Sequence, residues 1–328
     1  MFLFGIGLFS DYLQSTRFIS TNFQFIIIPL NCKADLIGQF NRSNPQHLQV
    51  RNMYEIVSRE QLAPRIVKLQ VRAPRVAKTV KPGQFIVLRV DQTGERFPLT
   101  VVEHNHRLGI LTLVVQTIGS STEKLASLEP GEKISDLLGP LGEPSEIDYY
   151  GRVLCVGGGV GTALILPVAR ALSANGNEVV TLLGARTEQL LIFTDELAEF
   201  SQQLLITTDD GSAGSQGNVA EKLTELLESG ERFDRVYATG PVPMMRAIAD
   251  ITEPYAIKTL VSLNPIMVDG TGMCGGCRVQ VGDRLRFACT EGPEFDGHQV
   301  DFADLLARQN YYSDSHNCRL PDFSEDGN

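Results

Sequence analysis

The chain has 328 residues, a formal net charge of −10 and 43% hydrophobic residues, so it can bury the cores of two or three domains. A surface for nucleic acid or for an anionic membrane needs concentrated lysine and arginine, and this acidic balance argues against both. No segment reaches the roughly 18 unbroken apolar residues that a membrane helix needs. We therefore expect neither a nucleic-acid nor a membrane partner.

Residues 1–52 show no clear periodicity. The opening MFLFGIGLFS is apolar but lacks a basic region and a cleavage site, which makes it a poor signal peptide. Periodic sequence begins abruptly at Met53, which is itself a candidate start codon. We predict a poorly ordered extension or an artefact of start-site choice, with a targeting or partner-docking arm as the alternative. At the other end, the polar residues 313–328 predict a disordered tail.

The first periodic block, residues 53–150, consists of short strand-like runs. β-branched and aliphatic residues dominate these runs, and turn sequences such as KPG and QTG separate them. The runs are RIVKLQVRA, GQFIVLRVD, RFPLTVVE and LGILTLVVQTIG. One short helix, STEKLASL, interrupts them. Short strands at this spacing predict a small antiparallel β-barrel.

Strands and helices alternate in the second block, residues 151–263. RVLCVGGGVG is a buried strand that runs into glycines, and the helix TALILPVARALSANG ends at a glycine. The alternation occurs four times, and AIKTLVSLN follows as a fifth strand. This pattern predicts an α/β fold, a doubly wound parallel nucleotide-binding sheet with helices on both faces.

A glycine run, Gly157–Gly161, lies between the first strand and helix of that block. Glycines in this context let a backbone approach a phosphate at a helix N-terminus. The run is neither a full G-x-G-x-x-G nor a Walker A loop, so a tight turn without a ligand is the alternative. ATGPVPMM also follows a strand, and ligands in open α/β sheets collect at the carboxyl ends of strands. One crevice should therefore be lined by Gly158, Gly184, Asp209 and Gly240.

Two arginines are candidates for phosphate binding. Arg186 ends the second strand of the α/β block, where its guanidinium would meet an adenosine phosphate or stack on adenine; a solvated side chain is the alternative. Arg96 begins RFPLT in the barrel, and a hydroxyl-rich helix start follows at Ser120–Thr122. One cation, several donors and a helix dipole suit a pyrophosphate, although a plain turn fits equally well.

The third block, residues 264–312, is rich in glycine and holds three of the six cysteines. Cys274 and Cys277 form a C-x2-C pair, and Cys289 follows. This clustering favours an intracellular metalloprotein over a secreted disulfide scaffold. From spacing alone, tetrahedral zinc held by the three cysteines with Asp269 or His298 is open beside an iron–sulfur cluster.

Together the blocks resemble the ferredoxin–NADP reductase superfamily, in which a barrel holds FAD and a second domain holds a pyridine nucleotide. The shared motifs are R-x-[PYF]-x-[ST], G-x-[ST]-[ST], GGGxG and a late G-P-x-x-M. The cysteine block makes residues 53–312 resemble the electron-transfer subunits of class-B dihydroorotate dehydrogenase. The stretch resembles still more closely the small (alpha) subunit of NADH-dependent reduced ferredoxin:NADP oxidoreductases, also described as sulfide dehydrogenase-like. The domains implied are an FAD barrel (53–150), an NAD(P) domain (151–263) and a [2Fe–2S] domain (264–312).

The resemblance implies a role for residues in the first two blocks. The FAD-binding residues would be Arg96, Pro98, Leu99, Thr100, Gln116, Thr117, Ser121 and Thr122. The nucleotide-binding residues would be Gly158, Gly159, Gly161, Thr162, Arg186, Asp210, Gly240 and Pro241. Many reductases of this superfamily read C-G-P where this chain reads A-T-G, which puts a thiol contact to the nicotinamide in doubt. Because the cofactors carry out hydride transfer, no acid–base catalytic residue is predicted.

The resemblance also bears on the fourth metal ligand. Plant-type [2Fe–2S] spacing begins C-x4-C-x2-C, and Asp269 occupies the place of the first cysteine. Dihydroorotate subunits are expected to have Cys there, whereas the alpha subunits are expected to use Asp. An aspartate that only caps a turn, leaving the cluster one ligand short, is the alternative. The expected [2Fe–2S] ligands are Asp269, Cys274, Cys277 and Cys289.

The function implied is that of an NAD(P)H-dependent oxidoreductase subunit. Electrons would move between NAD(P)H, FAD and the [2Fe–2S] cluster, in either direction, and to or from a larger NADPH-linked, glutamate-synthase-like flavin and iron–sulfur subunit. Such a heterodimer would be cytoplasmic, with ferredoxin as a further candidate partner. The alternatives are service to a class-B dihydroorotate dehydrogenase and a non-enzymatic flavin and iron–sulfur redox sensor.

Overall fold

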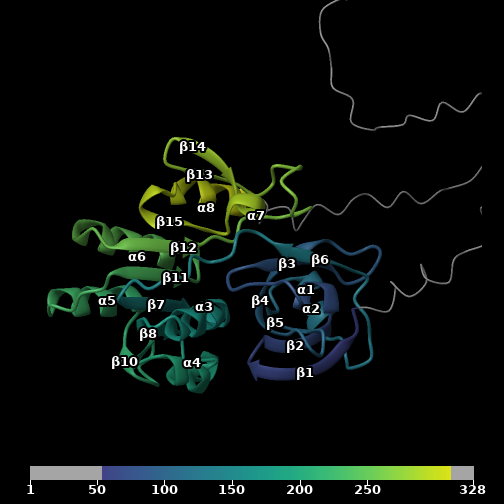
Figure 1. Ribbon diagram of the computed structural model, residues 1–328, viewed down its shortest axis with the longest axis horizontal. Helices are drawn as coiled ribbons and strands as arrows, with labels where there is room; N and C mark the ends of the chain where they lie inside the picture. Colours follow the sequence, from purple (N-terminus) through teal and green to yellow (C-terminus); the bar gives the residue numbers. More distant parts are fainter. Residues whose placement is uncertain (1–53, 312–328) are drawn as a thin grey trace, which may run out of the picture. The chain divides into compact units, whose positions relative to one another are not determined.

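The computed structural model describes residues 54–311, so the predicted extension (1–52) and tail (313–328) lie outside the described residues. The first strands form an antiparallel sheet in the order β1-β2-β5-β4-β3-β6, with a bridge between Glu55 and Lys133 joining its two ends (Figure 1). This confirms the antiparallel barrel. Its elements are β1 (Ile56–Ala63), β2 (Ile66–Arg72), α1 (Pro74–Ala77), β3 (Phe85–Arg89), β4 (Phe97–Asn105), β5 (Ile110–Gln116), α2 (Ser120–Ala126) and β6 (Asp136–Leu141).

Alternation along β3 shows how the barrel separates its core from its outer face. Ile86 and Leu88 belong to the barrel core, together with Leu69, Leu111 and other aliphatic residues of the neighbouring strands. Since successive side chains of a strand point to opposite faces, the residues between and after them lie on the outer face. The outer face of β3 and β6 carries side chains that line a candidate site, the cavity around Arg89 and Asp136.

Five parallel strands form the centre of the second sheet, whose order is β10-β9-β8-β7-β11-β12-β15. Helices cover both of its faces, as the alternating sequence predicted (Figure 1). The elements are β7 (Arg152–Gly158), η3 (Gly159–Gly161), α3 (Thr162–Ala174), β8 (Glu178–Ala185), η4 (Glu188–Leu190), α4 (Thr194–Phe200), β9 (Gln203–Thr208), β10 (Ser215–Gln216), α5 (Val219–Glu228), β11 (Arg235–Thr239), α6 (Val242–Thr252), η5 (Glu253–Tyr255) and β12 (Lys258–Ser262).

The cysteine block adds an unexpected strand to this sheet. β15 (Glu294–Asp296) pairs antiparallel with β12, so the sheet is mixed at this edge. The block also contains a hairpin, two helices and a 3-10 turn. These elements are β13 (Arg278–Val281), β14 (Arg284–Phe287), α7 (Ala288–Glu291), η6 (Gly297–Gln299) and α8 (Phe302–Tyr311). Between residues 54 and 311 no helix is long and apolar enough to cross a membrane.

The apolar core is continuous between the cysteine block and the second sheet. Cys277, Cys289 and Leu305 are buried in the same cluster as Val261 of β12 and Ile248 of α6. Phe85 and Val87 of β3 belong to this cluster too. The cysteine loop is therefore supported from the barrel as well as from the sheet.

Candidate functional site

Asp269 and Cys274 face each other across a glycine-rich loop. The backbone N–H of Thr271 donates to Asp269 Oδ1 at 2.7 Å, and that of Cys274 donates to Oδ2 at 2.8 Å. These donors, the Thr271 N–H first, hold the pKa of the Asp269 carboxyl below its usual range. The Cys274 side chain contributes a further hydrogen bond in the same direction. Asp269 is therefore a carboxylate in direct contact with a candidate cysteine ligand.

Cys277 and Cys289 form a second, buried pair. Burial, followed by a hydrogen bond with Cys277, raises the pKa of the Cys289 thiol to about 12. The four candidate ligands thus form two pairs, Asp269 with Cys274 and Cys277 with Cys289. A two-iron cluster takes two protein ligands on each iron, and two pairs of ligands fit such a cluster.

The alternative zinc ligand, His298, is engaged elsewhere. Its Nε2 lies 3.0 Å from the Thr252 hydroxyl, and its Nδ1 lies 3.8 Å from Asp296.

Gly270 brings the cysteine loop against the barrel. It has φ +75°, and an added Cβ would lie 2.7 Å from Leu141 and 2.9 Å from Val87. Only glycine fits this close approach without displacement.

The glycine run packs against the end of β11. β7 and β11 are neighbours at the point where the strand order reverses, which is where open α/β sheets bind ligands. A Cβ on Gly161 would lie 2.4 Å from the carbonyl oxygen of Thr239, and the Thr239 hydroxyl donates to the Gly161 carbonyl at 2.7 Å. A Cβ added to Gly240 would lie 3.2 Å from the Cα of Gly158. The structure therefore brings the two predicted glycine motifs together.

Gly159 differs from the other glycines of that turn. It has φ +57°, and a Cβ added to it would meet nothing within 4 Å. Its backbone faces open space at the start of η3, the turn that leads into α3 at Thr162. An open glycine at a helix start is the cradle that a phosphate needs, so the residues present fit a nucleotide.

Arg186 and Asp210 follow adjacent strands, β8 and β9. The N–H of Asp210 donates to the Arg186 carbonyl at 3.3 Å, so the two turns touch, and both side chains are exposed. Asp210 Oδ1 accepts from the Ser212 hydroxyl at 2.6 Å, and this bond is the largest cause of the lowered pKa of the Asp210 carboxyl. Ser212 in turn accepts from the N–H of Glu188 at 2.7 Å. The loops after β8 and β9 are thereby tied together.

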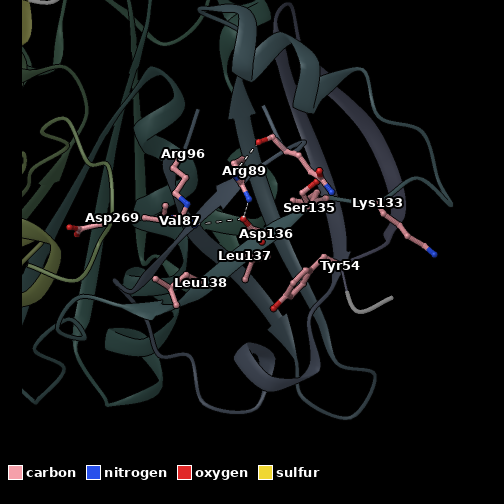
Figure 2. Close-up of a pocket in the computed structure, with 12 residues that line it drawn as sticks. Tyr54, Val87, Arg89, Arg96, Lys133, Ser135, Asp136, Leu137, Leu138 and Asp269 are labelled. Carbon is pink, nitrogen blue, oxygen red and sulfur yellow. Dashed lines mark hydrogen bonds and ion pairs between the residues drawn. The ribbon is translucent and has the colours of Figure 1, made fainter. Parts of the chain in front are cut away.

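A cavity of about 840 Å³ opens on the outer face of β3 and β6 (Figure 2). Arg96 lies in it 3.7 Å from Asp136, and Arg89 forms an ion pair with the same carboxylate. Asp269 lines the same cavity from the cysteine loop. The Nε of Arg89 is buried and has no hydrogen-bond partner. A buried donor without an acceptor, beside a second guanidinium, fits an anionic group such as a cofactor phosphate.

The structure does not place the other predicted FAD residues in this cavity. Pro98, Leu99 and Thr100 lie on β4, paired with β3. Thr122 accepts from the N–H of Ile118 and Gly119 at 3.0 and 3.1 Å, so its hydroxyl closes its own turn. The remaining members, at the end of β5 and the start of α2, are Gln116, Thr117 and Ser121.

Two family models match the chain. The oxidoreductase NAD-binding domain matches residues 155–250, and the iron–sulfur cluster binding domain of dihydroorotate dehydrogenase B matches residues 264–301. The dihydroorotate dehydrogenase B (NAD(+)) electron transfer subunit homolog of Thermotoga maritima is 46% identical over 79% of this chain and 91% of its own length. The chain belongs to the family of dihydroorotate dehydrogenase B electron transfer subunits. The subunit of Geobacillus thermodenitrificans is 32% identical over 76% of this chain and 98% of its own.

Solved structures agree with this family. A chain in the structure of NADH-dependent reduced ferredoxin–NADP oxidoreductase, described for flavin-based electron bifurcation, is 44% identical, with a TM-score of 0.77 over 80% of this chain and 95% of its own. The Amycolatopsis cytochrome P450 reductase GcoB, 20% identical over 62% of this chain and 66% of its own, with a TM-score of 0.53, shares the fold. As a dihydroorotate dehydrogenase B-type electron transfer subunit, the chain is an oxidoreductase subunit that uses FAD, an iron–sulfur cluster and NAD(P)H and works with a larger partner subunit. The expected family, fold and cofactors are confirmed.

Arg89 and Asp136 are functional candidates that sequence reasoning missed. They are 47 residues apart in the chain and meet only because β3 pairs with β6. One signal was present: Arg89 ends a strand whose alternation places it on the outer face, the face opposite the core residues Ile86 and Leu88.

Proposed function

We propose that this electron transfer subunit serves an NADH-dependent reduced ferredoxin:NADP oxidoreductase. The observation that carries the proposal is Asp269, a carboxylate in contact with Cys274 where a dihydroorotate dehydrogenase subunit is expected to have cysteine. The 44% identity to a chain of that oxidoreductase supports the same choice. Asp269 and Cys274 would bind one iron of a [2Fe–2S] cluster, and Cys277 and Cys289 the other.

The chain's own residues would position three redox groups. When bound, a flavin supplies the change from two-electron chemistry at a nicotinamide to one-electron chemistry at a cluster. Arg96 and Arg89 would hold its pyrophosphate, with Asp136 fixing both guanidinium groups. The turn around Gly159 would hold the phosphates of NADH, and Arg186 its adenosine. The division into domains at residues 150 and 263 follows the same assignment.

The larger partner would dock over the cysteine loop. Four apolar side chains of this region are exposed to solvent, Ile266 by 37%, Val268 by 54%, Met273 by 88% and Leu285 by 54%. Val268 and Met273 lie on either side of Asp269 in the loop. A partner that covers them would exclude water and approach the cluster closely, as electron transfer requires. The occupant we propose is the NADPH-linked, glutamate-synthase-like flavin and iron–sulfur subunit, in the cytoplasm, with ferredoxin reaching the complex through it.

A class-B dihydroorotate dehydrogenase is the second candidate. It is favoured by the family model over residues 264–301 and by the 46% identical relative, whose name refers to that enzyme. The two candidates share the cofactors and differ in the partner. A redox sensor without activity is the third, with a nucleotide crevice that no longer reacts.

Cofactor analysis and rapid mixing test the proposal on one anaerobic preparation. We expect roughly two irons, two sulfides and one FAD per chain. NADH should bleach the flavin in a stopped-flow mixer; absence of bleaching would favour the sensor. Zinc with little iron would overturn the cluster. Affinity purification from the native cells then separates the first two candidates, because the larger subunit that co-purifies is either glutamate-synthase-like or a dihydroorotate dehydrogenase.

A further inference from the structure

Two guanidinium groups reach the turn between the first two cysteines. Arg278 Nη1 donates to the carbonyl of Gly275 at 3.2 Å, and Arg308 Nη2 donates to the carbonyl of Gly276 at 3.1 Å. These carbonyls belong to the two residues that separate Cys274 from Cys277. Both cations therefore lie beside the loop that carries the proposed cluster ligands.

The position of Arg308 is fixed by the packing of α8. Phe302 and Leu305 are buried in the core that also contains Cys277 and Cys289. Arg308 is three residues after Leu305 and therefore on the same side of the helix. A second bond, from Gln309 Nε2 to the Asn264 carbonyl at 3.0 Å, ties the helix to the start of the cysteine loop.

Among the described residues, no carboxylate pairs with either of these two arginines, Arg278 and Arg308. Arg286 of the same block, in contrast, pairs with Glu291 at 2.5 Å. Four anionic ligands and two sulfides give the proposed cluster a net negative charge, and reduction adds one more electron without breaking or forming a bond.

We propose that Arg308, with a smaller contribution from Arg278, raises the reduction potential of the cluster. The inference rests on the proposed ligand set. A fixed cation stabilises the more negative, reduced state more than the oxidised state, because the Coulomb attraction grows with the added charge. Arg308 is half-buried and held by a packed helix, so solvent and salt screen it less than the exposed Arg278. Both are positioning and tuning residues rather than ligands.

The test is an EPR-monitored redox titration of the full chain and four variants, with iron and sulfide measured on each. For Arg308→Gln we expect the equilibrium constant for cluster reduction to fall about tenfold, which is about 59 mV for one electron. Arg278→Gln should lower it about two- to threefold, and less at high ionic strength. Arg308→Lys keeps the charge and should stay close to the wild type. Gln309→Ala removes a neutral bond from the same helix and should leave the potential unchanged.

Each outcome separates this inference from the proposed function. Wild-type protein without a [2Fe–2S] signal would defeat the ligand assignment itself. With the signal present, an unchanged potential in Arg308→Gln, or an equal shift in Gln309→Ala, would overturn the electrostatic role. If Arg308→Gln assembles no cluster, the exposed Arg278→Gln decides: a lowered constant supports the inference, and an unchanged one rejects it.

Discussion

At the scale of single residues, a carboxylate and a thiolate are both anionic ligands, but they differ in softness. Both oxygens of Asp269 also accept backbone N–H groups from its own loop. A thiolate at this position would donate more electron density to iron and would have no second oxygen for the N–H of Thr271. A change of side chain at position 269 should therefore alter the electronic state of a cluster but should not prevent the cluster from assembling.

Replacing the carboxylate tests this expectation. We expect Asp269→Cys to keep about two irons per chain, with a changed EPR spectrum and a changed reduction potential. Asp283→Cys provides the control, because it adds a thiol at an exposed turn of the same block. A spectrum for Asp269→Cys identical to the wild type would remove Asp269 from the ligand set.

Cys277 is expected to be needed for the cluster but not for FAD. It is 2% exposed, and its partner Cys289 is equally buried, whereas the arginine-lined cavity opens on β3 and β6 of the barrel. Cys277→Ala should lose at least nine-tenths of the iron while flavin content stays near one per chain. The buried Cys155 of β7, changed to Ala, should retain both. Loss of flavin together with iron in Cys277→Ala would contradict the separation of the two sites.

At the scale of elements, the turn between β7 and α3 keeps its shape because its backbone packs in van der Waals contact with the backbone at the end of β11. We expect Gly161→Ala to force this turn from the end of β11, since its Cβ would meet the Thr239 oxygen at 2.4 Å. The affinity for NADH, measured from stopped-flow flavin reduction, should fall at least about tenfold, equivalent to about 1.4 kcal/mol. Gly230→Ala is the control: its φ of +100° makes alanine costly, but it follows α5 and meets nothing within 4 Å. Equal loss of NADH affinity in both variants would show a general effect of folding.

Local patterns predicted most elements, and pairing partners decided the rest. The runs around Leu69, Leu111 and Val153 carry their own periodicity and became strands where expected. β15 has only three residues and is a strand because it pairs with β12, a contact that no local pattern contains. α8 was not predicted from the sequence, because this helix lies in the glycine-rich block of residues 264–312. Like the strands, the cysteine and glycine motifs are patterns of residues close together in the sequence, so they could be recognised there. The partners of Arg89 and Arg308 could not, because tertiary packing brings them together.

At the scale of the whole molecule, one carboxyl group joins the barrel-to-sheet linker to the cysteine block. Ser145 donates a hydrogen bond to Glu294 of β15 at 2.6 Å, and β15 completes the second sheet. Burial raises the pKa of Glu294 to about 7, opposed by the Ser145 hydrogen bond, raised further by Glu146 and opposed by Arg235. Cys155 and Tyr237 are the other titratable groups that respond to its charge. The junction therefore contains a carboxyl group that is easily protonated.

The direction of the pH effect follows from this raised pKa. In the unfolded chain Glu294 loses its proton near pH 4.5, whereas in the folded protein it keeps the proton up to about pH 7. Its contribution to stability is complete below the unfolded value and is lost as pH rises through 7. Glu294→Gln keeps a neutral acceptor for Ser145 at every pH. The thermal midpoint of this variant should therefore rise relative to the wild type between about pH 4.5 and pH 7 and stay level above pH 7, by about 2–4 °C for each kcal/mol involved. A difference that stays constant from about pH 4.5 to pH 7 would show that the pKa of Glu294 is not raised in the folded protein.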